Sequence, residues 1–533
     1  MKRRVGIYGW GVVAPRSPNV AAFESNLESA ESWLEPFTGF GPSNFLVGNP
    51  AFSFETYKPW INERFEPRRF AQLEDKMGNM VKYAIGAFIQ SLGQNPGLEA
   101  LLAELGSQAH VYIGTGLGDY AKQYQVFRGY EAAQRRWDEF WCRDPHHPEL
   151  AAYRRADPAE QARLRAAAGA PPDPETVNGD VFDRENAREA WYKFWLDRST
   201  GLAAYLAELR EIEGEDIGVD IEASKGHVIR RKMASRRKLS ARFGAPVEPW
   251  NAVDASLLWN IANIPAAQVS MVGHITGPTL APVAACSTFG TALWMACNAI
   301  QLGQAKAVVV GAADPEPHPL SVGTFYNARV LCNDGRASKP FTGLRGTHVA
   351  GGACVWVVGD AEFMAARGLE PLGLEVLGVG VTSDADHIIT PSKDGPRMAL
   401  ELALDAAGIR PEQVATWDMH ATATPGDWNE LQNTLEMLPE IRCLTARKGI
   451  FGHGMSVCGG WELTAQHLGM ARGRVMPTTL SAGEVHPQLQ PFADRLVGAA
   501  GAEVEGGVAG KVNAGVGGIN ACVICRRWGD GSR

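Results

Sequence analysis

The sequence has little of several features that would assign its class at once. No uncharged apolar run approaches the length of about 18 residues that a transmembrane helix requires, so we expect no membrane span. Acidic residues outnumber basic ones, 59 to 51, and the net charge of −8 argues against a general nucleic-acid-binding protein. No G-x-S-x-G motif is present, which disfavours a hydrolase of the Ser-His-Asp type. The N-terminus has no apolar signal region, and we expect a cytoplasmic protein.

Cysteine usage also excludes two kinds of protein. The nine cysteines lie mostly in apolar runs such as Ala353–Trp356, which is typical of buried free thiols and not of a disulfide framework. Cys522 and Cys525 form a single C-x-x-C in a strand-like segment, with no second pair, so we interpret them as core residues. No zinc-type cluster is visible in the sequence, and we expect no metal site.

Apolar strand-like runs alternate with helix-length segments along most of the chain, which predicts an α/β fold. The expected strands are Val5–Val13, Val111–Gly116, Ala307–Ala312, Ala353–Val358, Leu372–Thr382, Thr416–His420, Cys443–Ala446 and Val512–Cys525. The order of elements is similar in two halves, 1–365 and 366–533, with a boundary near Gly359–Pro371. This is a weak internal repeat, visible in layout and not in residue identity.

Residues 120–244 depart from this pattern. They contain no convincing strand, and their charge density rises sharply. Aromatic residues recur there at helical spacing: Phe127, Tyr130, Trp137, Phe140 and Trp141. We expect a mostly helical insertion in the first half.

Three short segments carry residues suited to thioester chemistry. Cys286 precedes a helix-compatible run, and a thiol at a helix N-terminus has its thiolate stabilised by the dipole and by free N–H groups. On the local sequence alone, a small core cysteine is the alternative. His420 ends a predicted strand in H-A-T-A-T-P. Lys448 lies five residues before His453 in K-G-I-F-G-H, where a solvated lysine is the alternative.

The order of these segments resembles the active-site signature of the β-ketoacyl synthases, the condensing enzymes of the thiolase superfamily. Because the second motif position is a histidine, His453, and not an asparagine, the signature resembles that of the elongating Cys-His-His enzymes. The resemblance implies a thiolase-like fold of two related α/β halves in five layers (αβαβα), and a homodimer. The implied activity is that of an acyltransferase of the 3-oxoacyl-acyl-carrier-protein synthase type, which condenses an acyl thioester with a malonyl thioester and releases carbon dioxide. The implied pathways are fatty acid or polyketide-type chain elongation. The implied partner is an acyl carrier protein, which supplies the phosphopantetheine, and no tightly bound cofactor is needed.

The resemblance also implies a role for each matching residue. Cys286 would accept the acyl group, and His420 and His453 would donate to the thioester oxygen of the malonyl group. Lys448 would complete the catalytic set. The remaining matches are a pair that would hold the pantetheine arm and a closing glycine-rich loop that would line the substrate site: Thr422 and Thr424, then Val516, Gly517 and Gly518. The N–H groups of Cys286 and Val516 would form the oxyanion hole.

Two departures from the family pattern leave alternatives open. Val516 stands where the family commonly has a phenylalanine that gates the acyl pocket. Gly352 stands where the family usually has a glutamate that helps to hold the lysine, so the task of Lys448 is open. An acyltransferase or decarboxylase without condensation is therefore an alternative. A non-catalytic subunit of a heterodimer is another, although such subunits usually lack the cysteine. Acyl chain length and pathway also stay open.

One basic run stands out in this acidic chain. Between residues 230 and 238, six of nine residues are positively charged and none is acidic: Arg230, Arg231, Lys232, Arg236, Arg237 and Lys238. Carrier proteins of these pathways are generally acidic, so we expect this run to help to dock the carrier. The alternatives are a solvated helix face and an intramolecular partner for the acidic segment Glu211–Asp220.

Overall fold

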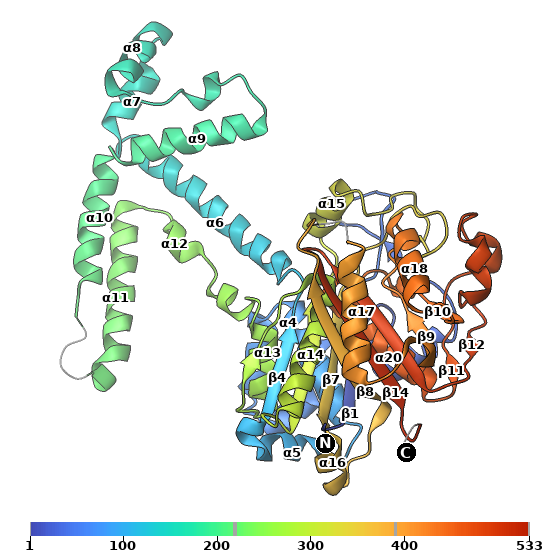
Figure 1. The fold of residues 1–533 in the computed structure, drawn as a ribbon. Coiled ribbons are helices and arrows are strands. Elements are labelled where there is room, and N and C mark those ends of the chain that lie inside the picture. The colour runs from blue at the N-terminus through green and yellow to red at the C-terminus, as the bar shows by residue number, and fades with distance from the viewer. Residues whose placement is uncertain (1, 217–220, 389–391, 531–533) are drawn as a thin grey trace. The chain divides into compact units, whose positions relative to one another are not determined.

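The computed structural model describes residues 2–216, 221–388 and 392–530 (Figure 1). They form two compact units. The first comprises Met1–Lys122 and Ser256–Arg533, and the second is Gln123–Ala255.

A ten-stranded sheet runs through the first unit in the order β10-β9-β13-β14-β8-β1-β7-β6-β4-β5. Its strands are β1 (Val5–Val13), β4 (Ala109–Gly114), β5 (Thr279–Leu280), β6 (Ala307–Asp314), β7 (Gly352–Asp360), β8 (Leu372–Ser383), β9 (Val414–Asp418), β10 (Cys443–Thr445), β13 (Val508–Gly515) and β14 (Ile519–Arg527). Two short antiparallel pairs lie outside it, β2 (Glu35–Pro36) with β3 (Leu46–Val47) and β11 (Arg474–Val475) with β12 (Ala502–Glu503).

The sheet consists of two five-stranded halves with the same topology. In the first half, β1, β7 and β6 are antiparallel neighbours, and β6, β4 and β5 are parallel neighbours. In the second half, β8, β14 and β13 repeat the antiparallel part, and β13, β9 and β10 repeat the parallel part. The halves join where β1 meets β8, through only two residue pairs, Val5–Val376 and Ile7–Leu372. The repeat expected from the layout is therefore a repeat of sheet topology.

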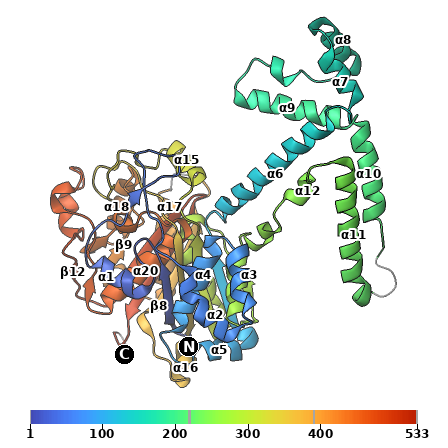
Figure 2. The same cartoon turned by 180° about the vertical axis from the view of Figure 1, so that it is seen from behind.

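Helices complete five layers around this sheet. The helices α14 (Thr288–Gln301) and α20 (Cys458–Met470) lie in the middle, where Phe289, Trp356 and Trp461 belong to one buried core with residues of both halves. One outer layer, α4 (Asn79–Leu92) and α13 (Ile264–Val272), packs on the first half, and Figure 2 shows α4 on the rear side. The other, α17 (Asp394–Ala407) and α18 (Gly426–Met437), packs on the second half. The thiolase-like αβαβα architecture is confirmed.

The other helices of the first unit are short. They are α1 (Val20–Leu27), α2 (Lys58–Arg64), α3 (Arg68–Lys76), α5 (Leu98–Glu104), α15 (Pro319–Asn327), α16 (Ala361–Ala366) and α19 (Lys448–Phe451). No helix in the described ranges is long and apolar enough to cross a membrane.

The second unit contains no strand in its described residues. Its helices are α6 (Tyr120–Trp141), α7 (Pro148–Arg155), α8 (Pro158–Ala168), α9 (Val181–Leu196), α10 (Thr200–Glu213), α11 (Ile221–Phe243) and α12 (Pro249–Ala252). Trp137, Trp141 and Tyr205 centre one small core, and Trp191 and Trp195 centre another. The helical character of 120–244 matches the expectation, and the unit extends further, to Ala255.

One expected strand was wrong. The segment Val512–Cys525 is not a single strand, because β13 and β14 form an antiparallel hairpin across residues 516–518. Gly517 and Gly518 have φ values of +91° and +71°, the left-handed conformation that glycine adopts without strain. All nine cysteines are free thiols, and Cys522 and Cys525 are buried on β14.

The two halves are fastened to each other by reciprocal hydrogen bonds next to two equivalent turns. Ala285, at φ +47°, opens the 3₁₀ turn before α14, and Met455, at φ +50°, opens the matching turn before α20. Ser287, in the first turn, donates to Ile519 O at 2.7 Å in the second half. Ser456, in the second turn, donates through its backbone N–H to Asp314 Oδ2 at 2.8 Å, at the end of β6.

Candidate active site

Cys286 occupies the 3₁₀ turn Ala285–Ser287, directly before α14, as the sequence predicts. Its side chain is 8 % exposed. The hydroxyl of Ser287 holds this turn against the β13–β14 hairpin, because it donates to Asn513 O at 3.0 Å and to Ile519 O at 2.7 Å. The thiol therefore lies where the helix of the first half meets the hairpin of the second.

The environment of Cys286 does not leave a thiolate at rest. Burial raises the pKa of the thiol to about 11, although the Lys448 charge and the N–H groups of Val516 and Cys286 act in the opposite direction. The expected stabilisation of the thiolate by the helix terminus is thus smaller than the opposing effect of desolvation. The two N–H groups are the donors that an oxyanion on a thioester bound to this sulfur would need.

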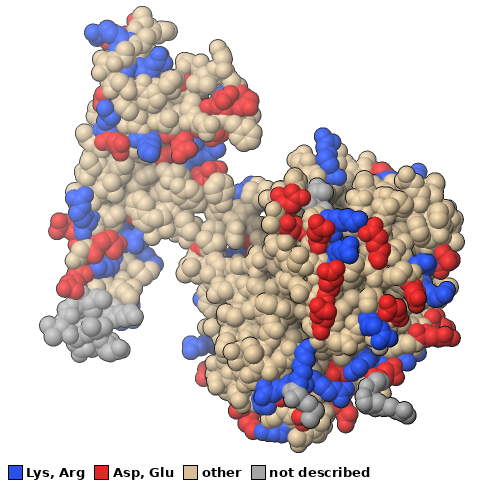
Figure 3. Space-filling model, in the orientation of Figure 1, with Lys and Arg blue, Asp and Glu red and all other residues tan. Residues whose placement is uncertain are grey.

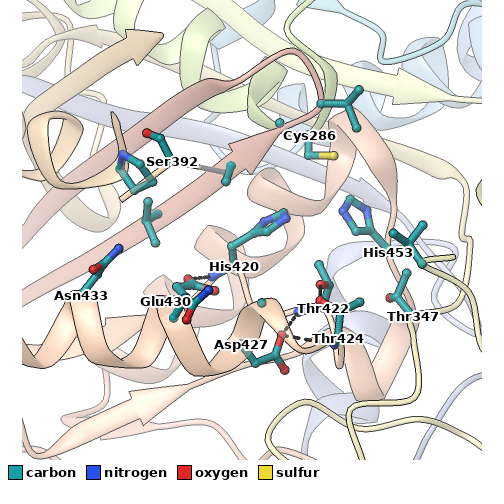
Figure 4. A pocket seen from close by; sticks show the side chains of 18 of the residues that line it. Cys286, Thr347, Ser392, His420, Thr422, Thr424, Asp427, Glu430, Asn433 and His453 are labelled. Atoms are coloured by element: carbon teal, nitrogen blue, oxygen red, sulfur yellow. Dashed lines mark hydrogen bonds between the residues drawn. The ribbon is translucent and has the colours of Figure 1, made fainter. Parts of the chain in front are cut away.

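His420 and His453 converge on the thiol from the second half. The sulfur of Cys286 and one ring nitrogen of each histidine all lie within 4.8 Å of one another. The two rings stand almost perpendicular, at 79°, with centroids 5.4 Å apart. Figure 4 shows both rings directed toward Cys286 from below. The three residues that the sequence motifs nominated are therefore brought together.

The hydrogen bonds of both rings assign their tautomers. Nδ1 of His453 accepts from the backbone N–H of Met455 at 3.0 Å. Nδ1 of His420 lies 3.4 Å from Nδ2 of Asn513, and the same amide nitrogen donates to a carboxylate oxygen of Glu462 at 3.2 Å. Because both Nδ1 atoms accept, the proton of each neutral ring is on Nε2, the atom left to face the cavity.

Both histidines are neutral at physiological pH. Burial, assisted by the Lys448 charge, lowers the pKa of His453 to about 3. Burial and the charges of Lys448, His453 and Lys511 hold the pKa of His420 well below its ordinary value. A thiol and two imidazoles are also a possible zinc-ligand set, but a ligating ring must offer a nitrogen lone pair. Here Nε2 carries the proton and Nδ1 accepts an N–H, so the arrangement fits proton donation better than metal binding.

Lys448 is fully held by a carboxylate that the sequence reasoning missed. Its Nζ lies 2.7 Å from Oε1 of Glu462 on α20, and it also donates to the carbonyl of His420. Burial works against its charge, but the Glu462 carboxylate raises the pKa of Lys448 above its ordinary value. The task left open for Lys448 is thereby given a structural basis: it braces the chain at His420 and pairs with Glu462.

Gly352 cannot supply the carboxylate that the family comparison suggested. A Cβ at this position would lie 2.2 Å from the carbonyl oxygen of Val13 and 2.7 Å from the Trp461 ring, and Gly352 has φ +144°. The close passage of β1 thus requires glycine here. The carboxylate that holds Lys448 is therefore that of Glu462, and not one at position 352.

The segment after His420 is braced by two acids of α18. Asp427 accepts from the N–H groups of Thr422 at 2.8 Å and Ala423 at 3.0 Å, and Figure 4 draws its bonds to Thr422 and Thr424. Ala423 is strained, at φ +60°, and the hydroxyls of Thr422 and Thr424 lie 2.9 Å apart. Glu430 accepts from the N–H of Ala421 at 2.8 Å. The two threonines are thus presented at the cavity as the sequence motif suggests.

The hairpin loop of Val516, Gly517 and Gly518 contributes Val516 to the same cavity wall as these threonines. Val516 is 42 % exposed and lines the cavity, and the Gly518 carbonyl accepts from the N–H of Asp384 at 2.7 Å. Gly517 and Gly518 themselves are not among the cavity-lining residues.

A cavity of about 410 Å³ contains the thiol and both histidines. This volume is within the range of sites for organic ligands of moderate size. Residues that precede and residues that follow His420 in the sequence make its wall, including Phe325, Val330, Thr347, Leu400, Trp417, Asn433 and Met437. Figure 4 shows Thr347 on the side of His453, and Ser392 and Asn433 on the opposite side.

The basic run is on α11, in the second unit, and several of its charges are already paired. Arg231 pairs with Glu215, and Arg236 lies 3.3 Å from Glu213. Lys232 donates to the Glu213 carbonyl at 2.6 Å. On the face drawn in Figure 3, acidic and basic side chains are interleaved over this unit. The described residues thus support in part the alternative that the run pairs with the acidic segment upstream, of which residues 217–220 lie outside the described part.

Comparison with known proteins agrees with this geometry. Two family models match, "Beta-ketoacyl synthase, N-terminal domain" at residues 203–362 and "Beta-ketoacyl synthase, C-terminal domain" at residues 374–482. The 3-oxoacyl-(acyl-carrier-protein) synthase 2 of Staphylococcus aureus (strain COL) is 32% identical over 228 residues, which are 41% of this chain and 55% of that protein. The synthase 2 of Rhizobium meliloti (strain 1021) is 30% identical over 279 residues, 50% of this chain and 65% of that protein. The chain therefore spans between about half and two thirds of these relatives.

Solved structures share the fold at low sequence identity. A beta-ketoacyl synthase from Burkholderia phymatum STM815 aligns with 99% of this chain at a TM-score of 0.66 and 18% identity. The ishigamide ketosynthase/chain length factor aligns with 99% at 0.66 and 19% identity. A type II PKS ketosynthase, solved in complex with its acyl-carrier protein, aligns with 99% at 0.63 and 17% identity. With both domain models matched in order and the same fold in these structures, the chain belongs to the β-ketoacyl synthase family.

Proposed function

We propose that this protein is a condensing enzyme that joins an acyl thioester to a malonyl thioester with loss of carbon dioxide. The observation that supports it best is the convergence of one thiol and two neutral imidazoles, with the sulfur and one nitrogen of each ring within 4.8 Å of one another. Acyl transfer to the thiol needs only the sulfur of Cys286 and the two backbone N–H groups of the oxyanion hole. Two further donors are needed when a second anion, an enolate, must form next to the acylated sulfur.

The first step is acyl transfer to Cys286. The sulfur attacks the carbonyl carbon of the acyl thioester, and the oxyanion is held by the N–H groups of Cys286 and Val516. The bond from that carbon to the sulfur of the donor breaks, and the thiol proton ends on the departing thiol. Because the Cys286 pKa is about 11, the proton must leave the sulfur as the new bond forms and not beforehand.

The second step uses the histidines. The malonyl thioester carbonyl accepts from Nε2–H of His420 and of His453, and the bond to the carboxylate breaks with release of carbon dioxide. The electron pair forms an enolate whose oxygen both donors stabilise. Its carbon attacks acyl-Cys286, the C–S bond breaks, and the thiolate takes a proton from solvent. Removing one such donor in other enzymes costs about 10²–10³ in turnover.

The proposed partner is an acyl carrier protein, which would bring the phosphopantetheine arm to Thr422 and Thr424. The hydroxyls of these threonines are hydrogen-bonded to each other at 2.9 Å and both residues line the cavity, where they can exchange this bond for one to an amide group of such an arm. No bound cofactor enters either step. Arg230, Arg237 and Lys238 are the basic residues of α11 that we propose for contact with the carrier.

We also propose a homodimer that forms through the β5 edge of the sheet. Strand β5 is terminal in the strand order, and an edge strand offers unpaired backbone groups to a second copy. Met271, Leu280 and Val283, on and around this strand, are 54%, 46% and 58% exposed. Sedimentation at low micromolar concentration tests this proposal, and a stable, active monomer would contradict it.

Intact-mass measurement with a panel of acyl carriers tests the proposed function. We expect one acyl adduct on Cys286 and carbon dioxide release when malonyl carrier is added. Cys286→Ser should lose both, whereas the control Cys458→Ser, which alters a buried thiol outside the proposed steps, should keep both. His420→Ala and His453→Ala should still take up acyl groups but lose about 10²–10³ of carbon dioxide release. An adduct on another cysteine, or normal condensation in both histidine variants, would refute the assignment.

A further inference from the structure

A second buried ammonium group lies behind His420, and the proposed steps do not use it. Lys511 on β13 places its Nζ 2.8 Å from Oε2 of Glu462, while Lys448 occupies the other oxygen, Oε1, at 2.7 Å. The three side chains are at most 1 % exposed. One carboxylate is thus shared between two lysines with no access to solvent.

Both lysines also hold the chain that carries His420. Lys511 donates to Val512 O at 2.7 Å and approaches Met419 O at 3.4 Å, while Lys448 donates to the carbonyl of His420 itself. Two successive carbonyls at the end of β9 are therefore held by two ammonium groups. The hold continues into the ring, because Asn513 links Glu462 Oε2 to Nδ1 of His420.

The charges of this cluster do not balance. Lys448 alone would neutralise Glu462, and the neighbouring Arg447 is matched by Asp418 at 2.7 Å, with both side chains fully buried. Lys511 therefore adds one positive charge. The other titratable groups that feel its charge are His453, Cys458, Cys522 and Glu430. Of these, Glu430 has its pKa raised to about 7 by burial, and it carries at most a partial charge near neutrality. In a buried, poorly screened site such an excess acts over several ångströms.

We propose that Lys511 is a positioning residue, which keeps Glu462 and Asn513 in register with His420 and supplies the unbalanced positive charge that favours an anionic intermediate in the cavity. This inference rests on the proposed function, because the intermediate is the enolate. It goes further by assigning a residue two places before Asn513 whose own side chain does not line the cavity, although Val512, Ala514 and Gly515 of the same strand do. A buried ion pair that served stability alone would not need a second cation on the same carboxylate.

The first test follows the protonation of His420 without any turnover. Ring-¹⁵N NMR of histidine-labelled protein, with the His420 signal identified from a His420→Asn sample, reports tautomer and pKa directly. In the parent protein we expect a neutral ring protonated on Nε2 near pH 7, because burial and neighbouring charges hold the pKa of His420 well below its ordinary value. In Lys511→Met, which has a similar volume and no charge, we expect the pKa of His420 to rise, because one of the charges that lowers it is removed. The control is Lys306→Met. Lys306 does not line the cavity, and its Nζ lies 3.0 Å from Oδ2 of Asp360.

The second test separates the two steps. In Lys511→Met, acyl loading of Cys286 should stay within about twofold, while carbon dioxide release falls about 10-fold or more, and Lys511→Arg should recover part of that loss. An unchanged His420 pKa, or equal loss of loading and release, would overturn the proposal. If Lys511→Met does not fold, Lys511→Gln gives the same comparison with a polar side chain. A parent protein that releases no carbon dioxide would refute the proposed function, and the NMR titration would still decide the role of Lys511.

Discussion

The side-chain amide of Asn513 lies 3.4 Å from Nδ1 of His420, and this contact decides which ring nitrogen carries the proton. The amide cannot turn over without placing its oxygen against the Glu462 carboxylate, which accepts only. The proton-donating face of His420 is therefore set by a residue that does not line the cavity.

Replacing Asn513 should impair the second step selectively. Asn513→Asp keeps the shape but presents an acceptor to Nδ1, which favours the opposite tautomer and withdraws Nε2–H from the cavity. We expect carbon dioxide release to fall about 10²-fold, as for loss of an oxyanion donor, with acyl loading retained. Rapid-quench measurement of both steps checks this, with Asn186→Asp at an exposed position of α9, outside the cavity lining, as the matched control. Equal loss in both steps would contradict it.

The pH dependence of turnover should be set by an acid and not by the histidines. Burial lowers the pKa of His453 to about 3 and holds the pKa of His420 well below its ordinary value, so both are neutral donors near pH 7. Burial raises the pKa of Glu430 to about 7, and its ionised form accepts from the N–H groups of His420 and Ala421. That bracing is present above pH 7 and is lost as the pH falls through 7. Carbon dioxide release should decline there, and Glu430→Gln should remove the inflection. An unchanged inflection in Glu430→Gln would assign it to another group.

Val516 should control which acyl groups reach the thiol. Its side chain lines the cavity beside Cys286, and a phenylalanine would fill part of the roughly 410 Å³. We expect Val516→Phe to slow the loading of long acyl groups at least about tenfold while two-carbon groups load normally, because overpacking penalises only the larger ligand. Leu302→Phe, at a 72% exposed position, is the control. Intact-mass time courses over a chain-length series check the ratio, and a uniform change at all lengths would exclude a gating role.

Carrier docking at α11 should depend on the cations that have no acidic partner in the described part of the chain. Arg237→Glu combined with Lys238→Glu should raise the apparent KM for carrier-bound substrate several-fold and affect a short pantetheine thioester much less. Added salt should move the parent protein toward the variant. The control is Arg163→Glu, which alters an exposed arginine paired with Glu160 on α8. Equal effects on both substrates would show that this surface does not dock the carrier.

The reactive residues could be predicted from sequence because each belongs to a local motif. Cys286, His420 and His453 are recognisable from their immediate neighbours, and the repeat of elements predicted the two halves. Their supporting residues could not be found in this way. Glu462, Lys511 and Asn513 meet only because α20 packs against β13, which pairs with β9. A signal was available: Glu462 follows Gly-Gly-Trp in an otherwise apolar run, and such a charge must find a buried partner.

The hairpin shows a second limit. Val512–Cys525 is apolar almost throughout, and periodicity alone does not distinguish one long strand from two joined by a tight turn. The glycines at 515, 517 and 518 were the indication of the turn, because a strand interior rarely contains three. The task of Lys448 stayed open for a different reason. Position 352 was compared along the chain, whereas the lysine is held by Glu462, which is adjacent to it only in space.

The reciprocal serine bonds between the halves make the chemistry conditional on their assembly. Ser287, beside the nucleophile, is held by the second half, and Ser456, in the equivalent turn, is held by Asp314 of the first. Neither half alone can keep its turn in place or contain a complete cavity. A polypeptide cut between β7 and β8 would therefore behave as a complementation pair. Each fragment alone would be inactive, and activity would return when the two fragments associate. The duplicated architecture thus links activity to correct folding, because the reactive site around Cys286 is complete only when both halves are assembled.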